Sequence, residues 1–460
     1  MSHVGKGSVL LGGLFVGLLS AQGPQSPQGP TVVFEGARLI TGVGPAAQEN
    51  GAFVVQGGRF VSVGQKGQLA APPGAQRVDL TGKTVIPALV NAHVHLGYDR
   101  GLTYAVENFT RDHLIAQLER YAYAGVGAVT SLGTDPGQLA FAVRAQQEAG
   151  LVGGALLLTA GRGFAPPNAG PANQAMKPAA YGVTTEVEAR AGVREQVGRG
   201  VDIIKIWVDD RGGTVPKLAP ALIRVIVEEA HLYNTRVIAH VYYVADARML
   251  VELGVDGFAH LPRDLPVDEV LAATMKARNV FVLPNLAVSE NGTHLTPPQW
   301  LDDPLLREFV GTPELDRLRA SYTRRTPAGV ERSRAIYAGM QQSMARLKAA
   351  GVLFGFGSDA GAVQDHFHAF TDHRELQLMV DAGLTPIEAL VAATQSSAAI
   401  LRRKERGLID EGMRADFLVL DANPLENIAN TKRISNVYLR GAAVDRAGLR
   451  KTWAGQSGGQ

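Results

Sequence analysis

The chain has 460 residues, of which 46% are hydrophobic and 19% charged, and this composition excludes an intrinsically disordered protein. Its 45 basic and 43 acidic residues give a formal net charge of +2, which provides no positive field for binding nucleic acid. Cysteine is absent, so disulfides, thiolate metal sites and a cysteine nucleophile are excluded, and any metal must be bound by histidine, carboxylate or a less usual ligand.

The first residues, 1–21, have the pattern of a signal peptide. Lys6 precedes an apolar run over residues 9–19, and small residues follow it at Ser20 and Ala21. The run is too short to cross a bilayer, and no later segment is apolar and long enough for a stable membrane span. We therefore expect an exported protein, periplasmic or secreted, whose leader is cleaved. A Gly/Pro/Gln-rich linker follows at residues 22–30.

Both ends of the remaining chain have β-strand patterns. Residues 31–85 contain alternating apolar runs such as VVFEGARLI and GAFVVQGGRFVSVG, and residues 403–450 contain GMRADFLVLDANP and NVYLRGAAVDR. We expect these two parts to pair into one small β-sandwich domain formed by both chain ends. Residues 451–460 are expected to be a flexible tail.

The middle of the chain, residues 86–402, alternates apolar strand patterns with amphipathic helix patterns. The predicted strands are, in order, VIPALVNAHVH, GAVTSLGT, ALLLTA, VDIIKIWV, RVIAHV, GFAHL, VFVLPNL and LFGFGSDA. Buried parallel strands that alternate with helices predict an α/β fold, the (β/α)8 TIM barrel. An open doubly wound sheet is the alternative, but no glycine-rich dinucleotide motif follows the first strand. Long connections at 161–182 and 287–329 follow strand ends, where such barrels have their active-site face.

Ionisable residues interrupt the ends of these apolar strands. His93 and His95 lie two residues apart on the first strand, so both side chains are expected on one face. Four further strands carry Lys205, His240, His260 and Asp359. The carboxyl ends of barrel strands converge on one mouth, and burying this many ionisable groups together is costly without a compensating cation. Imidazole and carboxylate suit Zn²⁺ and related divalent ions, so the sequence predicts a metal site.

Lys205 is the least expected residue of this set, because an ammonium group repels metal cations and cannot coordinate them while protonated. Three interpretations are open. Lys205 pairs with Asp202 or Asp209, or it is neutral with a depressed pKa, or it is carboxylated by CO₂ and becomes an anionic ligand.

With these motifs in order, the chain resembles the amidohydrolase superfamily of metal-dependent hydrolases. The segments IPALVNAHVHLG and GMRADFLVLDANP are also similar to it, and RELQLMVDAGLTPIEALVAAT resembles the imidazolonepropionase-like subgroup. That subgroup includes Xaa-Pro dipeptidases with a carboxylated lysine and ochratoxin-hydrolysing amidases. One departure is Asn91, which replaces the carboxylate that usually precedes the two histidines and puts the bonding near His93 in doubt.

The resemblance implies two divalent metal ions, with zinc expected, and a CO₂-derived carbamate on Lys205 that bridges them. One ion would be held by His93, His95 and Asp359, and the other by His240 and His260. A bridging hydroxide activated by the metals would attack the carbonyl carbon of a small amide or dipeptide, and the C–N bond would then break. Asp359 would shuttle its proton to the departing nitrogen.

Three further residues are candidates by position. Tyr242 follows His240 by two residues and is expected to hydrogen-bond the substrate carbonyl oxygen or simply to pack. Arg263 is a candidate to bind a substrate carboxylate. His366 is a candidate to line the pocket or to hold a metal ligand in place, and a surface position is the alternative.

Two other functions are weighed against this hypothesis. A mononuclear cyclic-amide hydrolase or deaminase of the imidazolonepropionase type typically lacks the lysine of the fourth strand, so Lys205 argues against it. A barrel that binds without catalysis is disfavoured by the complete ligand set. The sequence leaves the substrate open, and it leaves homo-oligomerisation open as well.

Overall fold

The computed structural model describes residues 1–3, 30–42 and 47–457. The expected leader at 1–21 and linker at 22–30 therefore lie almost wholly outside the described residues. Within the described part of the chain, no helix is long and apolar enough to cross a membrane.

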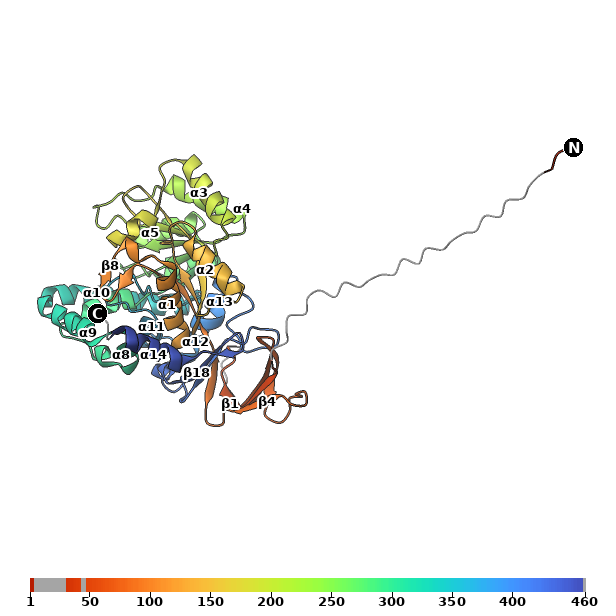
Figure 1. Ribbon diagram of the computed structural model, residues 1–460. Helices are drawn as coiled ribbons and strands as arrows, with labels where there is room; N and C mark the ends of the chain where they lie inside the picture. Colours follow the sequence, from red (N-terminus) through yellow and green to blue (C-terminus); the bar gives the residue numbers. More distant parts are fainter. Residues whose placement is uncertain (4–29, 43–46, 458–460) are drawn as a thin grey trace.

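Strands from both ends of the chain form one eight-stranded sheet, in which β17 near the C-terminus pairs antiparallel with β5 near the N-terminus. Its strands are β1 (Val32–Leu39), β2 (Gln48–Gln56), β3 (Arg59–Gln65), β4 (Gln76–Asp79), β5 (Thr84–Pro87), β17 (Phe417–Leu420), β18 (Ile434–Leu439) and β19 (Ala442–Ala443). Phe34, Phe53 and Phe417 pack ring against ring in its core, with centroids 5.0–5.1 Å apart. Figure 1 shows β1 and β4 beside β18, as expected for chain ends that share one sheet.

Short parallel strands fill the middle of the chain and form two sheets. The strands are β6 (Leu89–Val94), β9 (Val126–Ser131), β10 (Leu156–Thr159), β13 (Ile204–Val208), β14 (Val237–Val241), β15 (Gly257–Ala259) and β16 (Phe281–Leu283). One sheet has the order β10-β9-β6. The other contains β13, β14, β15 and β16 in that order, and two short strands within residues 161–182 extend it beyond β13. The fold is thus mixed α/β, as predicted.

The predicted eighth strand, residues 353–360, forms isolated bridges instead of a continuous strand. Phe354 pairs with Val282 of β16, and Ala360 pairs with Val94 of β6, both in parallel. On the β10 side, the backbone N of Asp202, two residues before β13, donates to the carbonyl of Thr159 in β10 at 2.8 Å. Hydrogen bonds therefore connect both edges of the three-stranded sheet to the other parallel strands.

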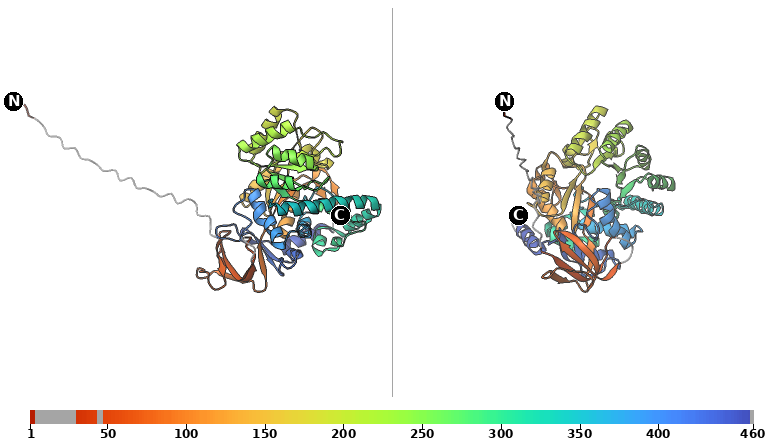
Figure 2. Two further views of the ribbon diagram at one scale, coloured as in Figure 1. Left: turned by 180° about the vertical axis from the view of Figure 1, so that it is seen from behind. Right: turned by 90° about the vertical axis from the view of Figure 1, so that its right-hand side faces the viewer.

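Helices lie around the parallel strands (Figure 2). They are α1 (Arg111–Tyr123), α2 (Leu139–Glu148), α3 (Glu186–Gly198), α4 (Pro220–Leu232), α5 (Val244–Glu252), α6 (Glu269–Ala277), α10 (Pro327–Ala349), α11 (Phe370–Asp381), α12 (Pro386–Val391) and α13 (Ser397–Ile400). Local chemistry sets where they begin: Thr185 and Glu188 form a capping box at the start of α3. The helices bury their apolar faces in the core. Ile223 and Ile226 of α4, for example, belong to the core cluster that contains Val237.

The long connections and the C-terminus contain further elements. Residues 161–182 hold β11 (Phe164–Ala165), a 3-10 helix at Gln174–Ala179 and β12 (Tyr181–Gly182), and residues 287–329 hold α7 (Ala287–Glu290), α8 (Pro304–Phe309) and α9 (Thr312–Ser321). A small hairpin follows the first strand, with β7 (Asp99–Arg100) and β8 (Thr103–Tyr104). Near the C-terminus the chain forms α14 (Arg446–Ser457), in which Trp453 is 8% exposed and packs on Tyr123. The flexible tail at 451–460 stays a prediction.

Candidate active site

His93 and His95 stand at the end of β6, where the strand has one extra residue relative to its neighbour. Asn91 lies opposite Val129 and Val94 opposite Ser131, so the register shifts by one between these pairs. Such a bulge re-aims side chains next to functional sites. Both rings are buried, at 1% and 6% exposure, and their centroids lie 5.2 Å apart. The structure confirms that the two histidines face the same side.

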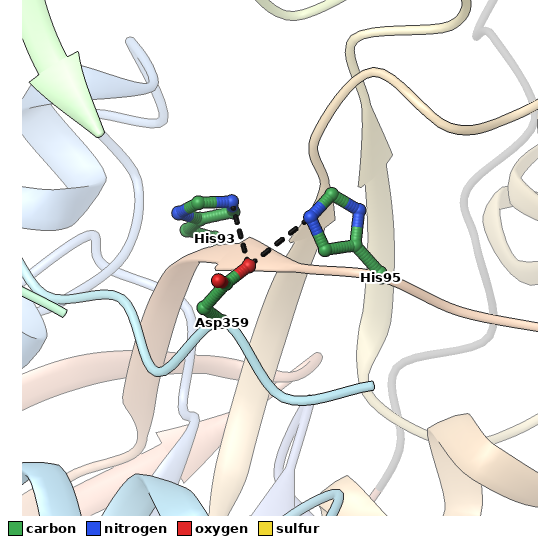
Figure 3. A group of neighbouring side chains, drawn as sticks. All are labelled: His93, His95 and Asp359. Carbon is green, nitrogen blue, oxygen red and sulfur yellow. Dashed lines mark ion pairs between the residues drawn. The ribbon is translucent and has the colours of Figure 1, made fainter. Parts of the chain in front are cut away.

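Asp359 meets both histidines, as Figure 3 shows. Its Oδ1 lies 3.0 Å from His93 Nε2 and 3.1 Å from His95 Nε2. One potential ligand atom from each of the three residues falls within 4.8 Å of the others, a spacing at which one metal ion can contact all three. Asp359 adopts the left-handed backbone conformation, with φ of 54°, and strained positions of this kind cluster at functional sites.

The other predicted histidines continue this cluster. His260 Nε2 lies 3.8 Å from Asp359 Oδ2, and its ring is 5.2 Å from the ring of His93 and 4.7 Å from that of His240. His240 Nε2 in turn contacts Asp209 Oδ2 at 3.2 Å. His260 also has a left-handed φ, of 85°, which turns the chain at the end of β15.

Lys205 is buried in the middle of β13, at 1% exposure. Its Nζ has no hydrogen-bond partner among the described residues. Asp202 instead pairs with Arg144, and Asp209 with His240, so the interpretation of Lys205 as a salt-bridged lysine is wrong. Burial lowers the pKa of the Lys205 ammonium to about 7, and nearby Asp359 only partly opposes this.

Burial also keeps the imidazoles neutral. Desolvation lowers the pKa of His93 and of His240 to about 4, and that of His260 well below its ordinary value. Burial works in the opposite sense on Asp359, but the adjacent imidazoles outweigh it and hold the pKa of this carboxyl well below its usual range. At neutral pH the site therefore combines the Asp359 carboxylate with the uncharged imidazoles of His93, His240 and His260, the protonation states that metal ligands require.

Side chains behind the ligands hold the rings in place. The Asn285 Oδ1 accepts a hydrogen bond from the backbone N of His260 at 3.0 Å and lies 3.2 Å from His93 Nδ1. Because an amide oxygen only accepts, His93 carries its proton on Nδ1 and has a lone pair on Nε2. The ring of His95 also has a contact behind it, since its Nδ1 lies 2.8 Å from Thr134 Oγ1. Such outer contacts orient metal-binding histidines.

A consequence of this tautomer is that two hydrogen-bond acceptors face each other. His93 Nε2, with its lone pair, and the ionised Asp359 Oδ1 are buried and neither has a hydrogen-bond partner among the described residues. Two acceptors 3.0 Å apart repel unless a proton or a cation lies between them. The nitrogen and oxygen donors therefore fit a divalent metal ion.

All six predicted ligands line one cavity of about 560 Å³. Tyr242 and Arg263 line it too, with the Arg263 guanidinium 4.9 Å from the centre of the Tyr242 ring. Other residues that line the cavity include Trp207, Asp209, Tyr243, Gly170, Asn173 and Met176. The last three belong to the 161–182 connection, which therefore covers the site, as expected for a long loop after a strand end.

Among the described residues, His366 is not one of those that line this cavity. It is 4% exposed, and its Nε2 lies 3.2 Å from the carbonyl of Ala287. This position does not support the expectation that His366 lines the pocket. The alternative expectation, that His366 lies on the surface, is wrong because the side chain is buried.

The sequence does not predict the ligand contacts of three residues beside the site, and it suggests Asp209 only as a partner of Lys205. Asn285 follows β16 just as the ligands follow their strands, so its position was a usable signal. Thr134 and Asp209 gave no such signal, because threonine and aspartate are common at strand ends for many reasons. Only the fold shows that they contact His95 and His240.

Asn91, the departure from the family pattern, completes the bonding near His93. Its Oδ1 accepts from the backbone N of His93 at 2.8 Å. The amide oxygen at position 91 thus provides an acceptor for the backbone of His93 where the family pattern has a carboxylate.

The model of the amidohydrolase family matches residues 84–444. The match spans the parallel strands, every predicted ligand and the C-terminal strands of the large sheet. The chain therefore belongs to the amidohydrolase family.

Particular relatives are more distant. Over 279 residues the chain is 25% identical to ochratoxinase of Aspergillus niger, a match over 57% of this chain and 50% of that protein, so only about half of its length is spanned. Among solved structures, a candidate prolidase from Bifidobacterium longum is 26% identical, with a TM-score of 0.72 over 92% of this chain and 98% of that chain. A Xaa-Pro dipeptidase with bound methionine, at 20% identity and a TM-score of 0.71 over 90% of this chain and 99% of that chain, shows the shared fold alone.

Proposed function

We propose that this protein is a metal-dependent hydrolase that cleaves the amide bond of small amides or dipeptides. The observation that carries the proposal is the contact of two buried acceptors, His93 Nε2 and Asp359 Oδ1, 3.0 Å apart in a cavity lined by every predicted ligand. The names of the relatives, ochratoxinase and prolidase, support a substrate of the amide or dipeptide class.

We propose that the parallel strands form one closed (β/α)8 barrel that gathers these side chains. The support is the set of hydrogen bonds and bridges at both edges of the three-stranded sheet, with residues 353–360 between β16 and β6. The sheet formed by both chain ends would be the separate β-sandwich domain, with parts at 31–85 and 403–450 around the barrel at 86–402.

The residues present would hold two divalent ions, with zinc expected. His93, His95 and Asp359 would bind one, and His240 and His260 the other, with Lys205 between them. When bound, such ions supply Lewis-acid activation of water and of the scissile carbonyl. A carbamate on Lys205 is proposed because Nζ is buried, unpartnered and able to exist as the neutral amine that reacts with CO₂.

The chain's own residues would then bind and protonate the substrate. The Asp359 carboxylate accepts the proton of the attacking water and returns it to the departing nitrogen, which is a poor leaving group unless protonated. Tyr242 donates a hydrogen bond to the carbonyl oxygen. Arg263 has an Nε without a partner among the described residues and lines the cavity, which suits a substrate carboxylate. Trp207 and Tyr243 provide apolar walls.

The cellular location and the state of assembly are further proposals. Export, with cleavage after the leader at 1–21, is supported by the sequence pattern alone. Mass spectrometry of the mature N-terminus tests it, and light scattering measures whether the chain forms a homo-oligomer.

The function is tested by metal analysis together with a hydrolysis screen. Purified protein, stripped and reloaded with zinc, is assayed with dipeptides ending in proline, N-acyl amino acids and lactams. We expect two metal equivalents and hydrolysis of at least one class, both lost in His93→Ala and Lys205→Ala. The exposed Lys348→Ala serves as a control for general effects of removing a lysine, since its ammonium pairs with Glu388 away from the cavity.

The outcomes separate the alternatives. One tightly held metal that is unaffected by CO₂ removal, with hydrolysis of a cyclic amide or a deamination, would favour the mononuclear enzyme. Full activity of Lys205→Ala would exclude the carbamate. Absence of any bound metal after reloading would overturn the proposed function.

A further inference from the structure

A buried amide–carboxylate pair lies directly behind the first metal ligands. The Asn91 Nδ2 donates to Asp372 Oδ1 at 2.6 Å and to Ser358 Oγ at 2.7 Å. All three side chains are completely buried, at 0% exposure. They join β6, the 353–360 segment and α11, elements that are distant in the chain.

Two members of this group bond to the backbone beside the ligands. The Asn91 Oδ1 accepts from the backbone N of His93 at 2.8 Å, at the bulge of β6. Ser358 immediately precedes Asp359, and its Oγ accepts from the backbone N of Ala360 at 3.4 Å. The group therefore bonds to the backbone at His93 and next to Asp359, and Asp372 connects to both places through Asn91 and Ser358.

The two polar side chains have complementary roles that depend on their identity. Asn91 uses its oxygen for His93 and its amide hydrogens for Asp372 and Ser358, so the carboxylate at 372 must accept. An aspartate at position 91 would still accept from His93, but it would place two carboxylates against each other in a dry site. An asparagine at position 372 would remove that repulsion, because its amide would become the donor.

We propose that Asn91 and Asp372 are a positioning pair that sets the separation of His93 and Asp359 in the metal site. The inference rests on the proposed metal dependence of the enzyme. It assigns a role in the active site to α11, from which Asp372 reaches the backbone behind the ligands. The pair touches neither metal nor substrate and acts through its bonds to His93 and Ser358.

The test is a reciprocal exchange, read out as metal affinity and not as activity. Zinc dissociation constants are measured by chelator competition for the wild type, Asn91→Asp, Asp372→Asn and the double variant. We expect Asn91→Asp to weaken binding by about 10- to 100-fold, the usual cost of disturbing an outer contact of a metal ligand. Asp372→Asn should weaken it less, because an amide oxygen at 372 still accepts from Asn91. The double variant should return to within about threefold of wild type.

Asp202→Asn is the matched control, because Asp202 is another buried carboxylate but bonds to Arg144 and Arg403 away from the ligands. It should lower the melting temperature of the metal-free protein without changing zinc affinity. If Asn91→Asp does not fold, the zinc affinities of Asp372→Asn and of the double variant are compared with that of the wild type instead. Wild-type zinc affinity in Asn91→Asp, or a double variant that binds no better than Asn91→Asp, overturns the positioning pair alone. A wild type that binds no zinc overturns the proposed function and the pair with it.

Discussion

Replacement of Lys205 by methionine should stabilise the metal-free protein while abolishing its function. The Lys205 Nζ is buried without a hydrogen-bond partner among the described residues, and its pKa falls from 10.5 to about 7. At about 1.4 kcal/mol for each pKa unit, holding this amine in the folded state at pH 7 costs about 4 kcal/mol. Methionine has nearly the same length and carries no charge. We therefore expect the free energy of unfolding to rise by about 3–5 kcal/mol at pH 7.

The pH dependence of this gain has a fixed sign. Between pH 7 and 10.5 the unfolded chain keeps the lysine proton that the folded chain has lost, so the wild type gains stability as the pH rises. The advantage of Lys205→Met should therefore shrink from pH 7 towards pH 10.5. Urea denaturation of chelator-treated protein in CO₂-free buffer measures both effects.

Lys217→Met is the control, because Lys217 is ion-paired with Asp246 and Asp210 and should gain nothing from replacement. A metal-free Lys205→Met protein that is no more stable than wild type at pH 7 would refute the reasoning. It would mean that Nζ has a polar partner in solution.

Four further results are expected. Removing metal with a chelator should abolish hydrolysis, and zinc should restore it; activity that survives chelation contradicts metal dependence. Asn285→Ala should weaken zinc binding by about 10- to 100-fold in chelator competition, because it removes the oxygen that orients His93; unchanged affinity would exclude this role. Arg263→Met should raise KM by about 10- to 100-fold for substrates with a free carboxylate but little for their amidated analogues, and an equal effect on both would exclude a carboxylate contact. Finally, the melting temperature of metal-free protein should fall as the pH drops from 6.5 to 4, since His93 and His240 have pKa values of about 4 when folded and take up protons on unfolding; a flat profile would contradict their burial as neutral rings.

Most of the candidate site follows from the sequence because barrel topology gathers strand ends. Histidines, a lysine and an aspartate that interrupt apolar strands are visible without coordinates, and all six line the cavity. The residues behind them are not visible in the same way. Asp372 lies on a helix and Thr134 in a loop, and neither breaks a pattern, so their contacts with the site follow from packing alone.

The sequence also placed one feature incorrectly. It gave His366 a place in the pocket because it follows Asp359 closely, but the backbone turns its ring towards the carbonyl of Ala287. It also does not predict that Trp453 packs on Tyr123, because this contact depends on a helix more than three hundred residues earlier in the chain.

The sequence by itself determined the donor chemistry of this protein: without cysteine, its site is built from nitrogen and oxygen ligands at the ends of apolar strands. Period-two alternation also determined that His93 and His95 share a face. Tertiary structure alone decided the electrostatic state of these groups. Whether Lys205 is paired, which nitrogen of His93 carries the proton and which carboxylate supports Asn91 depend on contacts between distant segments. Desolvation and hydrogen-bond geometry are properties of the folded site, and local sequence does not specify them.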